Sequence, residues 1–339
     1  INDLDETLPA PWEWDVKRLV ASVVVAARHL DLPESAAARA AVATARSYRE
    51  WMIDYAEMSA LDVWYGRIDL DRFNRYLESD SDRARVVRRV EQAQEKSAPE
   101  NLFPKLAEHR GGQPRIKDEP PLIFHPTVEQ APGVESGFAE GIAQYRKSLP
   151  AHVRVLFDRY TLCDVALKVV GVGSVGTFCG IALFMDPEEG ALFLQIKEAR
   201  PSVLEPYAGK SAYANNGERV VAGQRLMQSA SDIFLGWMKG ANGKDMYMRQ
   251  LRDAKISALV ETFDADALRN YGRMCGWALA RAHARSGDAA MMAGYMGSGE
   301  QSDEAMCEFA VAYADQNRRD YRAFIQAIRE GRIAVVSDI

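Results

Sequence analysis

The chain has 339 residues and a formal net charge of −6, which allows one large or two ordinary domains with a sizeable core. This acidic balance argues against a broad binding surface for nucleic acid. The four cysteines stand apart, with no CxxC pair, which argues against a structural zinc site and a disulfide framework and predicts a cytoplasmic protein. The longest apolar run, residues 19–27, is too short to span a bilayer, so no membrane partner is expected.

The first residues carry a cluster of acids. Asp3, Asp5 and Glu6 fall within four positions. An acidic cluster is commonly a solvated turn, but carboxylate oxygens are also the ligands by which phosphotransferases hold Mg²⁺. The residues alone leave both interpretations open.

The first half of the chain is predicted to be mostly helical. Apolar residues recur at helical spacing within 11–28, where Asp15 would cap the helix or brace the loop before it, and a second helix is expected over 34–66. Residues 69–97 are strongly charged, as on a solvated face. Residues 98–134 are rich in proline and glycine, which is typical of a linker, and include one short predicted strand. Two short helices follow.

In the segment 159–254, a glycine-rich turn lies between two predicted strands. The turn contains Gly171, Gly173, Ser174 and Gly176, and a third strand ends at Lys197. A strand, not a helix, follows the glycines, which argues against a dinucleotide-binding fold. Protein kinases use this order to fold a glycine loop over ATP phosphates and to aim a strand lysine at them. The alternative is a glycine-rich hairpin with a solvated lysine.

The next predicted helix, residues 217–231, offers two partners for that lysine. Gln224 lies on its apolar face, and Glu218 is the acid in its first turn. Either could meet Lys197, and the residues do not decide between them. A hairpin over 233–251 follows, and backbone groups near Gln250 and Leu251 are expected to meet an adenine.

Two helices are predicted after the hairpin, over 264–285 and 302–330. His283 lies on the apolar face of the first and is interpreted as a structural residue. Asp288 follows this helix as a catalytic-loop aspartate would. Ala293 stands where such a loop carries asparagine, so Asp288 is interpreted as a turn residue.

Five motifs carry a resemblance to a known family. They are NDLDET at 2–7, PWEWDVKRL at 11–19, GVGSVGT at 171–177, QRLMQ at 224–228 and WALARAHARSGD at 277–288. The chain resembles the domain of unknown function 2252 family, which is placed in the protein-kinase-like superfamily and is similar to aminoglycoside-phosphotransferase-like kinases. Leu4 stands where the family usually has Phe, and Ala222 where it often has Glu.

The resemblance implies a two-lobed, kinase-like α+β fold in circularly permuted order. Residues 1–158 and 255–339 would form the helical large lobe, and 159–254 the small, β-rich, nucleotide-binding lobe. Asp3 would be the metal aspartate and Asp5 a second ligand, and Lys197 the catalytic lysine. The implied cofactors are ATP and Mg²⁺, and the implied activity is phosphoryl transfer to a small-molecule or protein acceptor. The alternative is a nucleotide-binding pseudokinase or regulatory scaffold.

In this family a G-D-x-H-x-x-N-F segment stands just before the segment that NDLDET matches, and it resembles the catalytic loop of aminoglycoside-phosphotransferase-like kinases. The sequence begins at Ile1, after that position. We therefore expect the chain as printed to be truncated and unable to transfer phosphate alone, because a kinase-like site needs a carboxylate within reach of the acceptor hydroxyl.

Overall fold

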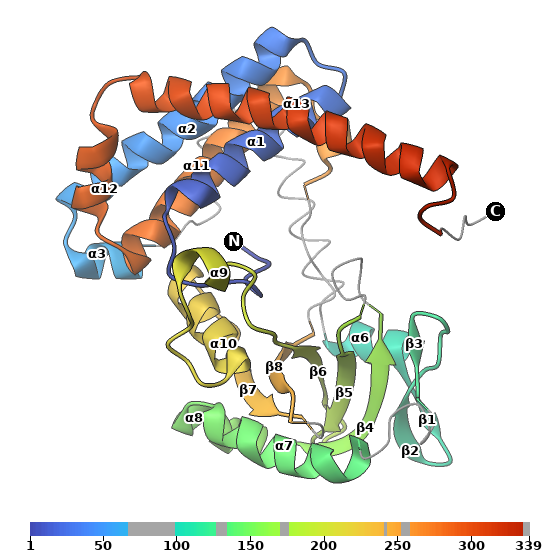
Figure 1. Cartoon of the computed structure of the whole chain (residues 1–339). Helices are drawn as coiled ribbons and strands as arrows, with labels where there is room; N and C mark the ends of the chain where they lie inside the picture. Colours follow the sequence, from blue (N-terminus) through green and yellow to red (C-terminus); the bar gives the residue numbers. More distant parts are fainter. Residues whose placement is uncertain (67–98, 127–133, 170–175, 241–242, 252–257, 335–339) are drawn as a thin grey trace. The chain divides into compact units, whose positions relative to one another are not determined.

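The computed structural model describes residues 1–66, 99–126, 134–169, 176–240, 243–251 and 258–334 (Figure 1). The chain forms two compact units. Residue 1 and residues 11–78 and 258–339 make the helical unit, and residues 2–10 and 79–257 make the sheet unit. The sheet unit thus takes in more of the chain than the 159–254 segment expected for a small lobe. The architecture is mixed α+β with antiparallel strands, as predicted.

Helices α1, α2 and α11 supply the centre of the helical unit. The described helices are α1 (Glu13–His29), α2 (Glu34–Glu57), α3 (Ala60–Tyr65), η2 (Val260–Thr262), α11 (Ala265–Ser286), α12 (Ala289–Met296) and α13 (Gln301–Arg329). The single helix expected over 34–66 is broken, because Met58 and Ser59 are extended and the Ser59 hydroxyl accepts from the Asp62 N–H as the cap of α3.

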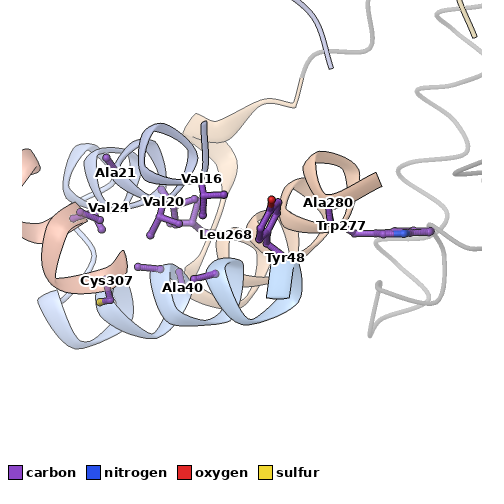
Figure 2. Close-up of a cluster of buried hydrophobic side chains, with 14 of the residues drawn as sticks. Val16, Val20, Ala21, Val24, Ala40, Tyr48, Leu268, Trp277, Ala280 and Cys307 are labelled. Carbon is purple, nitrogen blue, oxygen red and sulfur yellow. The ribbon is translucent and has the colours of Figure 1, made fainter. Parts of the chain in front are cut away.

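The core of the helical unit lies where these helices meet (Figure 2). Val20 and Val24 of α1, Tyr48 of α2 and Trp277 of α11 are at most 1% exposed. Helices α2 and α11 approach closely because Gly276 has no side chain, and a Cβ there would lie 2.5 Å from the carbonyl oxygen of Thr44.

The sheet unit is built on a six-stranded antiparallel sheet in the order β3-β4-β5-β6-β8-β7. Its strands are β3 (Ile123–Phe124), β4 (Thr161–Lys168), β5 (Cys179–Met185), β6 (Ala191–Glu198), β7 (Gly236–Lys239) and β8 (Asp245–Gln250). A separate hairpin of β1 (Ala107–Arg110) and β2 (Gln113–Ile116) was not predicted. The helices are α6 (Pro99–Leu106), α7 (Val134–Ser148), α8 (Ala151–Phe157), α9 (Glu205–Ala208) and α10 (Asn216–Met227).

The two faces of the sheet are covered differently. Helices α7 and α8 run along one face (Figure 1), where Tyr145 and Phe157 pack against Phe184, Leu194 and Ile196. On the other face, α6 and the β1–β2 hairpin cover apolar residues of β5 and β6. Because strand side chains alternate, Gln195 and Lys197 continue this second face beyond its apolar part. The strands therefore present a polar row next to a buried core.

Among the helices that the structure describes, none combines the length and the apolar character needed to cross a bilayer.

Candidate functional site

Lys197 stands in a row of side chains that crosses three neighbouring strands. It is directly opposite Cys179 of β5 on one side and Tyr247 of β8 on the other. Directly opposed residues of antiparallel strands project from the same face. The same register pairs Gln195 with Arg249 two positions along, and Arg249 donates to the Gln195 side chain over 3.2 Å.

The carboxylate of Asp5 lies on this row. The Lys197 ammonium donates to Asp5 Oδ2 over 2.6 Å, and the Tyr247 hydroxyl donates to the other oxygen, Oδ1. The ammonium also lies 5.6 Å from the centre of the Tyr247 ring. Asp5, Lys197 and Tyr247 form the cluster that we call the Lys197 cluster. The cluster brings together Asp5 and Lys197, which are 192 positions apart in the sequence, and each oxygen of the Asp5 carboxylate accepts a hydrogen bond.

Electrostatics stabilise this arrangement. Burial alone would raise the pKa of Asp5, but the hydrogen bonds from Lys197 and Tyr247 and the positive charges of Lys197 and Arg249 lower that pKa below its ordinary value. Burial and the neighbouring Asp5 charge raise the pKa of Tyr247, so its hydroxyl remains a donor. The ionised carboxylate of Asp5 therefore accepts from two donors, the Lys197 side chain and the Tyr247 hydroxyl.

Helix α10 fixes the backbone on which Asp5 stands. The guanidinium of Arg219, 2% exposed, donates to the carbonyl oxygens of Asp5, Thr7 and Arg200 over 2.6–2.9 Å. The Ser202 hydroxyl donates to the Glu6 carbonyl oxygen over 2.8 Å. The N-terminal segment is thus held by a helix residue and by the loop after β6, and the Asp5 side chain is directed along the row.

The end of the glycine-rich turn is anchored beside the same strand. Gly171, Gly173 and Ser174 lie outside the described residues. Gly176 has φ +74°, and its carbonyl oxygen accepts from Arg200, which also donates to Glu198 over 2.8 Å. The Phe178 N–H donates to Glu198 as well, over 2.9 Å. Glu198 is the last residue of β6, so these contacts hold the end of the turn against that strand.

One protein-family model matches nearly the whole chain. Residues 1–327 match the model of the family described as "Uncharacterized protein conserved in bacteria (DUF2252)". The chain belongs to the DUF2252 family. Neither the curated proteins nor the solved structures gave a match.

Four of the predicted partners and site residues of this DUF2252 chain make no hydrogen bond to the Lys197 ammonium within the described residues. Gln224 is buried, as expected from its place on α10, but within the described residues neither Gln224 nor Glu218 hydrogen-bonds to Lys197. The N–H of Gln250 donates to Asp232, and that of Leu251 to the Phe193 carbonyl oxygen over 2.9 Å. These two N–H groups are used inside the unit, so neither is open to an adenine in this structure.

The predicted metal ligands can be compared with what Mg²⁺ requires. Within the described residues, no group of three or more histidine, cysteine or acidic side chains is arranged to hold a metal ion. Phosphotransferases hold Mg²⁺ by one or two carboxylates, and nucleotide phosphates complete the coordination. Asp5 already holds a cation, the Lys197 ammonium, and Asp3 is exposed two residues away with φ +62°. Within the described residues, this DUF2252 chain therefore offers a metal ion two carboxylates here, those of Asp3 and Asp5, which is the number that phosphotransferases use.

Three polar residues of the helical unit have structural surroundings. His283 is 4% exposed, with Nδ1 2.8 Å from the Tyr48 hydroxyl and Nε2 3.2 Å from Asp15 Oδ2. The side chain of Asp288 accepts from the Met291 N–H over 2.9 Å and caps α12. These contacts agree with the interpretation of His283 and Asp288 as structural residues, and they give Asp15 a partner within its own unit.

Proposed function

We propose that this DUF2252 chain has a kinase-like fold in permuted order and that the protein binds ATP with Mg²⁺ at the Lys197 cluster in order to transfer a phosphoryl group. The observation that carries the proposal is the 2.6 Å contact between Lys197 and Asp5. Sequence reasoning connects these residues with different parts of one ligand, Lys197 with the phosphates and Asp5 with the metal. Their proximity, although they are 192 positions apart in the sequence, supports a single metal–nucleotide site.

The order of elements in the sheet unit supports the same proposal. A glycine-rich turn joins β4 to β5, a tight turn joins β5 to β6, and Lys197 is near the end of β6. Helix α10 and the β7–β8 hairpin follow, and β8 returns to pair with β6. In protein kinases the lysine is likewise on the second strand after the glycine loop, with a helix after it.

Each group has a role in this proposal. Lys197 binds phosphate oxygens as a compact charge, and Asp5 with Asp3 holds the metal. Glu198 and Arg200 fix the end of the glycine-rich turn. The metal, when bound, neutralises charge on the transferred phosphoryl group. Phosphoryl transfer depends mainly on positioning and on such neutralisation, and a set of rigidly held charged groups meets that requirement.

The site also departs from the kinase pattern. In kinases the strand lysine pairs with a helix glutamate, whereas here it pairs with Asp5. The helix still contributes, because Arg219 of α10 holds the backbone of Asp5. The proposed site therefore depends on α10 through a backbone contact to the metal-binding segment.

Calorimetric titration of the protein with ATP and Mg²⁺ tests the proposal. Lys197→Ala should weaken ATP binding about 10- to 150-fold, because a hydrogen bond to a charged group contributes about 1.5–3 kcal/mol. Lys210→Ala, at an exposed lysine of the same unit, is the matched control and should bind as the parent does. Equal affinity of the Lys197→Ala variant and the parent would contradict the proposed role. Tight binding of ATP without turnover, by a protein that carries the family's G-D-x-H-x-x-N-F segment, would favour the nucleotide-binding regulator.

A further inference from the structure

We infer that ATP and Mg²⁺ bind to this site interdependently, because the Asp5–Lys197 ion pair closes the ligand-free site and Tyr247 holds that pair in position. The inference rests on the proposed function and adds a form of regulation to it: either ligand alone binds weakly, and the pair opens only when both are present.

The ligand-free cluster is satisfied internally. Lys197 donates to one oxygen of Asp5 and Tyr247 to the other, so each carboxylate oxygen accepts a hydrogen bond and the ammonium balances the negative charge. The two charged side chains are only 21% and 34% exposed, so water replaces a lost contact incompletely. Separating Lys197 from Asp5 is therefore costly unless each finds a new partner of opposite charge.

A single ligand supplies one of these partners. Phosphate alone would attract Lys197 and leave the Asp5 carboxylate unpaired beside further negative charge. A divalent cation alone would take Asp5 and leave the ammonium beside further positive charge. Both together give alternating charges, with the metal on Asp5 and the phosphates on Lys197 and on the metal. Coupling between two ligands commonly amounts to about 5- to 150-fold in affinity.

Tyr247 is the positioning residue of this arrangement. Its side chain is 1% exposed and packs among Val220, Val221 and Leu235, so the hydroxyl has little freedom to move. It lies directly opposite Lys197 in the β6–β8 register, which brings its hydroxyl to Asp5 on the same row. The hydroxyl therefore keeps the Asp5 carboxylate at the ammonium when no ligand is bound.

The test compares ATP affinity with Mg²⁺ and with EDTA for four proteins. The parent should bind ATP weakly in EDTA. Asp5→Asn removes the charge that holds Lys197, so this variant should bind metal-free ATP several-fold more tightly than the parent does. Mg²⁺ should then increase its ATP affinity by a smaller factor, which we call the gain from Mg²⁺. Asp3→Asn is the matched control, because Asp3 has no contact with Lys197 within the described residues: it should reduce the gain from Mg²⁺ without tightening metal-free binding.

Tyr247→Phe keeps the buried ring and removes the hydroxyl. It should tighten metal-free ATP binding less than Asp5→Asn does, and it should reduce the gain from Mg²⁺. If Tyr247→Phe lowers the melting temperature but leaves the gain in ATP affinity from Mg²⁺ unchanged, Tyr247 is merely structural and its positioning role is overturned. Metal-free binding by Asp5→Asn that is no tighter than the parent's would overturn the closed ion pair. Absence of ATP binding by every protein in both buffers would instead refute the proposed function.

Discussion

The buried guanidinium of Arg219 donates a hydrogen bond to the backbone carbonyl oxygen of Asp5 over 2.9 Å. The contact joins a helix side chain to the backbone from which the Asp5 carboxylate projects. The position of that carboxylate thus depends on a residue that touches neither of the proposed ligands.

Arg219→Lys should loosen the N-terminal segment. A lysine keeps the charge but cannot serve the three carbonyl oxygens that the planar guanidinium reaches, and each hydrogen bond from a charged donor contributes about 1.5–3 kcal/mol. Hydrogen exchange of residues 2–10 should become faster. Arg225→Lys is the control on the same helix, because Arg225 donates to the carbonyl oxygen of Leu235, just before β7. Unchanged exchange in Arg219→Lys would show that other contacts hold the segment.

Asp3→Asn should leave the melting temperature unchanged and should remove most Mg²⁺-dependent turnover of a protein that carries the family's G-D-x-H-x-x-N-F segment. Asp3 is exposed and adopts φ +62°, a conformation that asparagine tolerates as well as aspartate does, so the fold loses little. The amide lacks the charge that a hard cation prefers. Thermal unfolding and a metal-dependent ATP turnover assay measure the two effects. Full Mg²⁺-dependent activity in the variant would rule out Asp3 as a ligand.

Stability of the sheet unit should fall in acid, and Glu198 should account for part of the loss. Burial would raise the pKa of Glu198, but the Phe178 N–H and the Arg200 and Lys244 side chains lower it to about 2. A folded-state pKa below the unfolded value gives stability that is present above about pH 4.5 and is lost as the pH falls toward 2, by roughly 3 kcal/mol in all. Denaturant unfolding of Glu198→Gln from pH 6 to pH 2 should show a shallower decline than the parent. Parallel curves would contradict this role of Glu198.

Gly276→Ala should destabilise the helical unit by about 1–3 kcal/mol, as expected for overpacking. The new Cβ would lie 2.5 Å from the Thr44 carbonyl oxygen and 3.1 Å from the Tyr48 nitrogen, so α2 and α11 would have to separate. Gly294→Ala is the control in α12, where a Cβ meets nothing within 4 Å and the helix gains propensity. Urea denaturation measures both. A Gly276→Ala variant as stable as the parent would show that the two helices can adjust freely.

Periodic patterns predicted most of the elements correctly. Apolar runs anticipated β5 and β6, and the stripes in α1 and α11 fall on the core as expected. The unpredicted β1–β2 hairpin has no apolar alternation, and its turn depends on Gly111 and Gly112, with φ of +62° and +80°. A Gly-Gly pair of this kind is a hairpin signal, but the surrounding prolines made the segment resemble a linker.

The partners of Lys197 could not be predicted from spacing. Helical periodicity offered Glu218 and Gln224 because they are close in sequence, whereas Asp5 reaches the lysine through tertiary structure alone. Tyr247 alternates with Met246 and Met248, which pack into the core on the other face, so its strand position was predictable. Its hydrogen bond to a residue 242 positions earlier was not, since no local pattern encodes it.

That separation matters for biosynthesis. Residues 2–10 leave the ribosome before the surfaces that receive them, because Tyr247 is synthesised 242 residues after Asp5. At about 5–20 residues per second, the segment waits roughly 10–50 s without its partners. The nascent chain can therefore complete the Lys197 cluster only after β8, which carries Tyr247, has been synthesised.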